Sequence, residues 1–140
     1  MKIFTILLTA VISLNAYASD DYMCKITGAF RVNSEGKQNH DGLKSLIGEN
    51  FSVNRASGLM LGALTNSFAA GPMVVDPGSE ESSFRVVNSM LNPVYDGHIT
   101  NSLTIHEFVD GKSKPFVFLG TEVEVYYGTC VHVLLDKVVK

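Results

Sequence analysis

Short stretches of alternating apolar and polar residues, separated by glycine, constrain this chain more than any other feature. In residues 22–33 the even positions, from Tyr22 to Val32, are largely apolar, and the odd positions are mostly polar. Residues 97–108 and 121–135 show the same period of two. Because successive side chains of a strand point to opposite faces, this pattern predicts half-buried antiparallel strands.

Turn dipeptides separate the alternating stretches, among them Asp96-Gly97 and Asp110-Gly111. We therefore expect an all-β, mainly antiparallel fold, a small single-domain β-sandwich or barrel of about seven or eight strands. At most one short helix fits this pattern. Residues 41–48 are its best position, because Asp41 could cap the helix and Gly48 could end it.

The stretch FSVNRASGLMLG, residues 51–62, most resembles a functional motif. It lacks the third glycine of a dinucleotide-binding loop, the Gly-Lys-Ser/Thr of a Walker loop and the G-x-S-x-G of a nucleophile elbow. We interpret it as a β-hairpin in which Gly58 takes the left-handed conformation of the turn. Gly62 would then serve a bulge or close packing in the returning strand. A helix over residues 58–68 is the alternative.

The first 18 residues have the composition of a secretory signal peptide. Lys2 precedes an apolar run, and Ala16-Tyr17-Ala18 is a small-x-small cleavage site. We expect residues 1–18 to be removed and residues 19–140 to form one β domain without a membrane span, secreted most simply to a Gram-negative periplasm. The sequon at Asn50 would matter only in a eukaryotic secretory route.

An exported chain with two cysteines most simply joins them, so we predict a Cys24–Cys130 disulfide. The alternatives are a free reactive thiol and a pair of metal ligands. Unbroken alternation places Cys130 on the polar face with Glu122 and Glu124, because Val123, Val125 and Tyr127 are expected to point inward. Either Gly128 forms a bulge that turns Cys130 inward, or the disulfide lies at the edge of the core.

The charge distribution argues against nucleic acid and anionic membranes as partners. Without Lys2, ten basic residues stand against fourteen acidic ones, and neither sign forms a run of five or more. No basic stripe interleaved with aromatic residues is present, and such a stripe is the usual signature of nucleic-acid binding.

Residues suited to catalysis or metal binding are scattered. No two of the four histidines (His40, His98, His106 and His132) share metal-ligand spacing, so we expect no metal and no cofactor. His106 and His132 are both expected on the polar side of their strands. Glu122 and Glu124 would share a strand face about 6.5–7 Å apart, a separation found in inverting glycosidases. A charged edge that discourages strand aggregation explains the two glutamates more simply.

Three residues are candidates for contact with a ligand or partner. Arg55 is a lone cation at the end of an apolar strand, and Tyr95 and Tyr126 are expected to be exposed, as tyrosines at binding hot spots often are. No coherent catalytic set accompanies them, so the sequence favours a non-enzymatic binding domain for a protein or a small ligand. The alternatives are an envelope hydrolase that uses Glu122, Glu124 and a histidine, and an inhibitor or immunity-type protein.

Overall fold

The chain folds into one curled antiparallel sheet. A computed structural model describes residues 21–68, 70–94 and 96–133. Its strands are β1 (Asp21–Val32), β2 (Gln38–Asn39), β3 (Asn50–Val53), β4 (Met60–Gly62), β5 (Met73–Pro77), β6 (Phe84–Leu91), β7 (His98–Ile105), β8 (Ser113–Leu119) and β9 (Glu124–Val133). The nine-stranded sheet has the order β4-β3-β1-β9-β8-β7-β6-β5, and β2 pairs with β1 outside this path. The expected all-β fold is confirmed.

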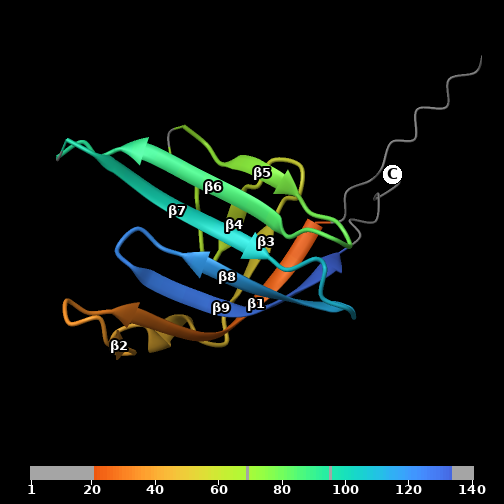
Figure 1. Cartoon of the computed structure of the whole chain (residues 1–140), viewed down its shortest axis with the longest axis horizontal. Helices are drawn as coiled ribbons and strands as arrows, with labels where there is room; N and C mark the ends of the chain where they lie inside the picture. Colours follow the sequence, from red (N-terminus) through yellow and green to blue (C-terminus); the bar gives the residue numbers. More distant parts are fainter. Residues whose placement is uncertain (1–20, 69, 95, 134–140) are drawn as a thin grey trace, which may run out of the picture.

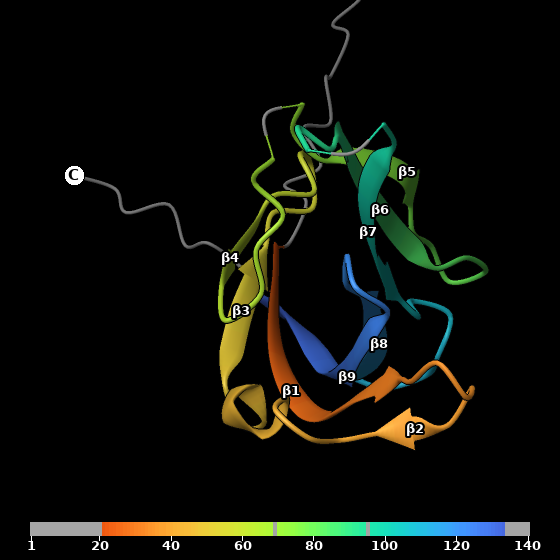
Figure 2. The ribbon, with the colours of Figure 1, turned by 90° about the vertical axis from the view of Figure 1, so that its left-hand side faces the viewer.

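The sheet curls into a half-barrel around its own core, as Figure 2 shows from β4 through β1, β9 and β8 to β5. The inner face carries the buried apolar side chains, which include Ile26, Phe51, Phe84, Leu103, Ile105, Phe116 and Phe118. Phe116 and Phe118, two positions apart on β8, share this inner face. No helix among the described residues is long and apolar enough to cross a membrane.

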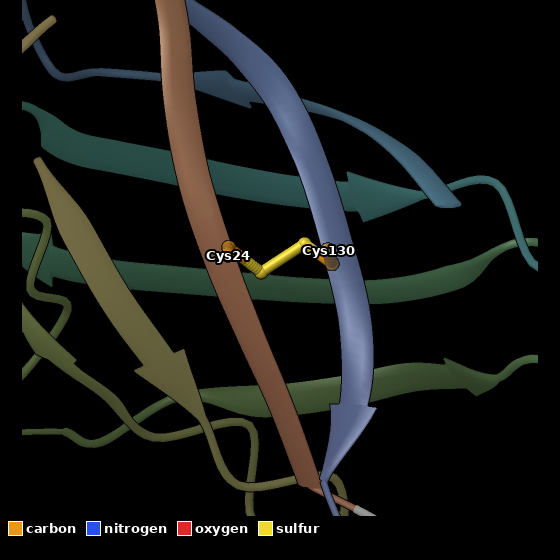
Figure 3. Close-up of a disulfide and its surroundings, with 2 residues drawn as sticks. All are labelled: Cys24 and Cys130. Carbon is orange, nitrogen blue, oxygen red and sulfur yellow. A yellow bond between two sulfur atoms is a disulfide. The ribbon is translucent and has the colours of Figure 1, made fainter. Parts of the chain in front are cut away.

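Cys24 and Cys130 form the predicted disulfide (Figure 3). They are direct partners in the ladder between β1 and β9, and both are fully buried. The bridge therefore lies within the core and links two central strands of the sheet.

The inner face of β9 is the opposite of the one predicted. Tyr126, Gly128 and Cys130 are buried without any break in alternation, whereas Tyr127 is 41% exposed. Val125, Tyr127 and Val131 therefore lie on the outer face, so apolar character alone predicts the wrong face for β9. The expected exposure of Tyr126 is wrong, since only 9% of it is accessible.

The register between β1 and β9 shifts at a β-bulge, which lies on β1 at Thr27 and not at Gly128. Ile26 pairs with Gly128 and Gly28 pairs with Tyr127, so β1 has one extra residue. Gly128 is still required there, because a Cβ at this position would meet the β1 backbone at Thr27 N at 3.0 Å. Beyond the bulge the faces of β1 exchange, and Val32 points outward instead of into the core.

The hairpin predicted for residues 51–62 is confirmed: β3 pairs with β4 from Phe51–Gly62 to Val53–Met60. Gly58 has φ +75°, and an added Cβ would lie 2.8 Å from a methyl group of Val86. Gly62, at φ +122°, approaches the backbone so closely that a Cβ would lie 2.8 Å from Asn50 O. Conformation and packing therefore both require glycine at these two positions.

The helix expected over residues 41–48 is only one 3-10 turn, η1 (Lys44–Leu46). Gly48 has φ +95°, as the end of a helix requires, but its N–H bonds to Ile26 O at 2.8 Å. Pairing with the β1 backbone therefore takes the place of a longer helix.

Asn66, which is 1% exposed, connects the β4 edge of the curled sheet to β6. Its side chain accepts a hydrogen bond from Met60 N–H at 2.8 Å and donates one to Gly58 O at 2.8 Å. Asn88 of β6 donates in turn to the main-chain carbonyl of Asn66. The Asn66 side-chain amide thus forms the two backbone hydrogen bonds, at Met60 of β4 and at Gly58 before it, that a neighbouring strand would otherwise form.

Candidate functional site

The strongest candidate site is a notch where β7 extends beyond its neighbour β8. Pairing between β6 and β7 covers all of His98–Ile105, but pairing between β7 and β8 begins only at Ser102, opposite Leu119. Residues 98–101 therefore have a described strand neighbour on one side alone. Figure 1 shows the β6–β7 hairpin reaching past the tip of the β8–β9 hairpin.

A hollow of about 450 Å³ occupies this notch. Its volume lies in the range typical of sites for small ligands. Several lining side chains are apolar and accessible, notably Leu119, which is 48% exposed. The full lining is Val32, Thr100, Asn101, Ser102, Leu119, Gly120, Thr121, Val123, Glu124 and Val125.

A second hollow of about 210 Å³ adjoins the first and shares with it Asn101, Gly120, Thr121 and Glu124. Thr65, Phe68, Phe118 and Tyr126 complete its lining. Phe118 and Tyr126 belong to the inner face of the sheet, whereas Leu119 and Val125 of the larger hollow belong to the outer face. The shared residues therefore lie between an outer and an inner recess.

Val123 is held in a costly backbone conformation beside the larger hollow. Its φ of 61° is the only positive value among the described non-glycine residues. A β-branched residue is disfavoured in this region, where glycine or asparagine would normally close such a short hairpin loop. The side chain gains little burial in return, because Val123 is 62% exposed. Strain of this kind, kept without a packing benefit, points to function.

Glu124 fixes the hairpin tip that carries Val123. Its carboxylate accepts a hydrogen bond from Glu122 N–H at 2.8 Å and pairs with Arg31 at 3.3 Å. Its main-chain carbonyl accepts from Gly120 N–H at 2.8 Å. Burial raises the pKa of nearby Tyr126, and the Glu124 carboxylate raises it further, while Arg31 opposes the shift. Tyr126 therefore lines the smaller hollow as a neutral residue.

Asn101 brings an unused amide group to both hollows. The residue is 4% exposed, and its side chain makes no hydrogen bond to any described residue. Its amide atoms are not among the fully buried unpaired polar atoms, so they reach the open space of the hollows. An unpaired amide in the wall of two hollows is therefore suited to recognising a bound group.

Arg55 lies at the other end of the half-barrel, on the turn between β3 and β4. Its guanidinium donates to Pro77 O at 3.0 Å and to Gly78 O at 3.2 Å. It also lies over the Tyr22 ring, 5.6 Å from the centroid. These contacts hold the β3–β4 turn against the β5–β6 turn, so most of the donors of Arg55 already serve the fold.

A buried polar cluster lies beneath Arg55. His132 Nε2 is 3.1 Å from Glu107 Oε2, and the rings of His132 and Tyr22 are 4.9 Å apart. Burial, and then the Glu107 carboxylate, raise the pKa of Tyr22 above its ordinary value. The Tyr22 hydroxyl lies beside Glu107 without meeting hydrogen-bond geometry, and Glu107 Oε1 and His132 Nδ1 also lack partners among the described residues. His132 therefore faces inward, contrary to the prediction from alternation.

The other candidate residues are not brought together. Glu122 precedes β9, so it does not share a strand face with Glu124 as expected. His40 bonds to Ala29 O, His98 lies 3.2 Å from Ser89 Oγ, and His106 lies 3.2 Å from Ser83 Oγ. Tyr95 and the expected signal peptide, residues 1–18, lie outside the described residues. In the described ranges no three His, Cys, Asp or Glu side chains group as metal ligands.

Sequence reasoning missed Val123 and Asn101. The alternation of residues 121–135 predicts an inward strand position for Val123, because it continues through the hairpin loop without a visible break. Asn101 occupies an alternate position with Leu103 and Ile105, and a polar residue on that otherwise apolar face was the available signal. Comparison with protein-family models, curated proteins and solved structures finds no match to this chain.

Proposed function

We propose that the protein is an exported, non-enzymatic binding domain that holds an apolar group of its partner in the larger hollow between β7 and the β8–β9 hairpin. The observation that carries this proposal is Val123, a valine in a left-handed conformation that exposes an apolar side chain beside the hollow. Selection for stability alone would favour glycine or asparagine at this position.

The compartment is part of the proposal. A buried disulfide between central strands is typical of proteins that fold in an oxidising environment. Together with the predicted signal peptide, it supports secretion to a Gram-negative periplasm. An inhibitor or immunity-type protein is one form of the proposed function, in which the partner is an enzyme of the same compartment.

An envelope hydrolase built on Glu122, Glu124 and a histidine receives less support from the geometry. Both oxygens of the Glu124 carboxylate already accept hydrogen bonds, one from Arg31 and one from the Glu122 backbone. Among the described residues the histidine that contacts a carboxylate is His132, and its partner is Glu107. Turnover of an ester or glycoside that Glu124→Gln abolished would favour the hydrolase over the binding domain.

The binding proposal can be tested with benzyl alcohol as a small apolar probe, followed by two-dimensional ¹H–¹⁵N NMR of the oxidised protein. We expect saturable shifts at hollow residues such as Ser102, Leu119 and Val125. Val123→Asn should weaken these shifts, because it removes an apolar group from the rim.

Val131→Asn is the matched control, because Val131 is an exposed valine of β9 that does not line either hollow. It should leave the shifts unchanged. Shifts spread over the whole apolar surface, or equal losses in both variants, would contradict the proposal.

A further inference from the structure

We infer that the partner presents an extended peptide segment, which pairs with the free edge of β7 and inserts an apolar side chain into the larger hollow. This inference rests on the proposed function and names the chemistry of the partner. It has three independent supports in the notch: a strand edge, an unpaired amide and an uncompensated charge.

The strand edge is the first support. Residues 98–101 of β7 pair with β6, and no described strand lies on their other side. Backbone groups of successive strand residues point alternately to the two edges, so some N–H and C=O groups of this segment face the notch. An added strand would satisfy them, as in other cases of β-strand addition.

The amide of Asn101 is the second support. A carboxamide offers one acceptor and a pair of donors, which complement the N–H and C=O of a peptide group. Because the Asn101 amide lines both hollows and has no side-chain partner within the described part of the chain, a partner that supplies both hydrogen bonds gains more than one that only fills space. A purely hydrocarbon ligand would leave this group without a partner.

Charge is the third support and further specifies the segment. Glu122 is exposed on the hairpin tip and forms no ion pair with a described residue, whereas neighbouring Glu124 is neutralised by Arg31. The rim therefore carries one uncompensated negative charge. It favours a lysine or arginine close to the inserted apolar side chain.

The test uses the pentapeptide acetyl-Lys-Thr-Leu-Thr-Lys-amide, titrated into the oxidised protein and followed by NMR. Two doubly N-methylated isomers serve as matched controls, one methylated at both threonines and one at the leucine and the second lysine. Because pairing with β7 uses one edge of the peptide, one isomer should bind roughly tenfold more weakly while the other stays within about twofold of the parent. Equal affinity of all three peptides, or equal loss in both isomers, would overturn the inference.

A peptide with glutamates in place of the lysines should bind more weakly at low salt, and equal binding would overturn the basic character of the segment. On the protein side, Asn101→Leu should reduce peptide affinity while preserving the shifts caused by benzyl alcohol. Equal peptide affinity in this variant would contradict the role of Asn101.

The outcomes also separate the two proposals. If benzyl alcohol binds in the hollow and the peptide does not, the inference fails and the proposed function stands. If neither binds, both fail. A concentration-dependent dimer in sedimentation, with protection of residues 98–101, would assign the edge to a second copy of the chain and overturn the peptide inference.

Discussion

Asn88 donates a hydrogen bond from its side-chain amide to the main-chain carbonyl of Asn66. This contact joins β6 to the segment that follows β4, and the side chain of Asn66 continues the connection to Gly58 and Met60. The open side of the half-barrel is therefore closed by one buried asparagine instead of a further strand pair.

Asn66→Leu should lower the free energy of unfolding by about 2–4 kcal/mol, because it leaves Met60 N–H and Gly58 O buried without partners. Asn101→Leu is the matched control, since Asn101 is also buried but makes no side-chain bond to a described residue. We expect the control to be neutral or slightly stabilising. Urea unfolding followed by circular dichroism measures both, and equal effects would refute the closing role of Asn66.

Replacing both Cys24 and Cys130 by alanine should lower the free energy of unfolding by about 3–5 kcal/mol in the chain-entropy view. The two residues are 106 positions apart in the sequence, so the bridge restricts most of the unfolded chain. Urea unfolding with and without a reducing agent measures the effect. The reducing agent should destabilise the wild type and leave the variant unchanged, and two free thiols in the unreduced wild-type protein would contradict the prediction.

Val123→Asn should raise the free energy of unfolding by about 1 kcal/mol, because asparagine tolerates the left-handed conformation better than valine does. The same variant should lose affinity in the benzyl alcohol titration. Val131→Asn should show the reverse, with a small loss of stability from lower strand propensity and no loss of affinity. A Val123→Asn protein that is less stable than the wild type would show that the valine serves the fold.

Tyr22 should make stability fall at alkaline pH. Its pKa is raised in the folded protein by burial and by Glu107, so the unfolded tyrosine, with an ordinary pKa of about 10, ionises first. The contribution of Tyr22 is therefore complete below pH 10 and decreases as the pH rises above that value. Tyr22→Phe should flatten this decrease in urea unfolding between pH 8 and 11.

The exposed tyrosine at position 127 provides the control for the alkaline measurement. Tyr127→Phe removes a hydroxyl group from the outer face of the same sheet. If it flattened the decrease as much as Tyr22→Phe does, the effect could not be assigned to the buried hydroxyl of Tyr22.

Local signals in the sequence predicted those strands and turns whose conformation depends on residues close together in the chain. Alternation predicted β1, β7 and β9, and Gly58 predicted the turn of the β3–β4 hairpin, because a positive φ is a property of a single residue. The same signals could not assign the inner face of β9. Both of its faces carry apolar residues, and the buried face is the one on which Cys130 stands opposite Cys24 of β1.

The candidate site was less accessible to sequence reasoning, because each of its parts is a relationship between distant segments. The notch exists because β7 continues beyond Ser102 where β8 has ended, and such a difference in length appears only once the strands are paired. Asn101 and Val123 have no distinguishing sequence motif. Asn101 stands out in the structure because it has a low exposed fraction and no side-chain partner among the described residues, and Val123 stands out because its φ is positive.

The sequence by itself determined an antiparallel β chain with a glycine-dependent hairpin and one long-range disulfide, since period, turn chemistry and cysteine count are local or additive properties. The tertiary structure alone decided which face of β9 is buried, how Asn66 closes the half-barrel and where a hollow opens. These features depend on strand register and on unequal strand lengths, which are set by the packing of the whole sheet rather than by any one segment.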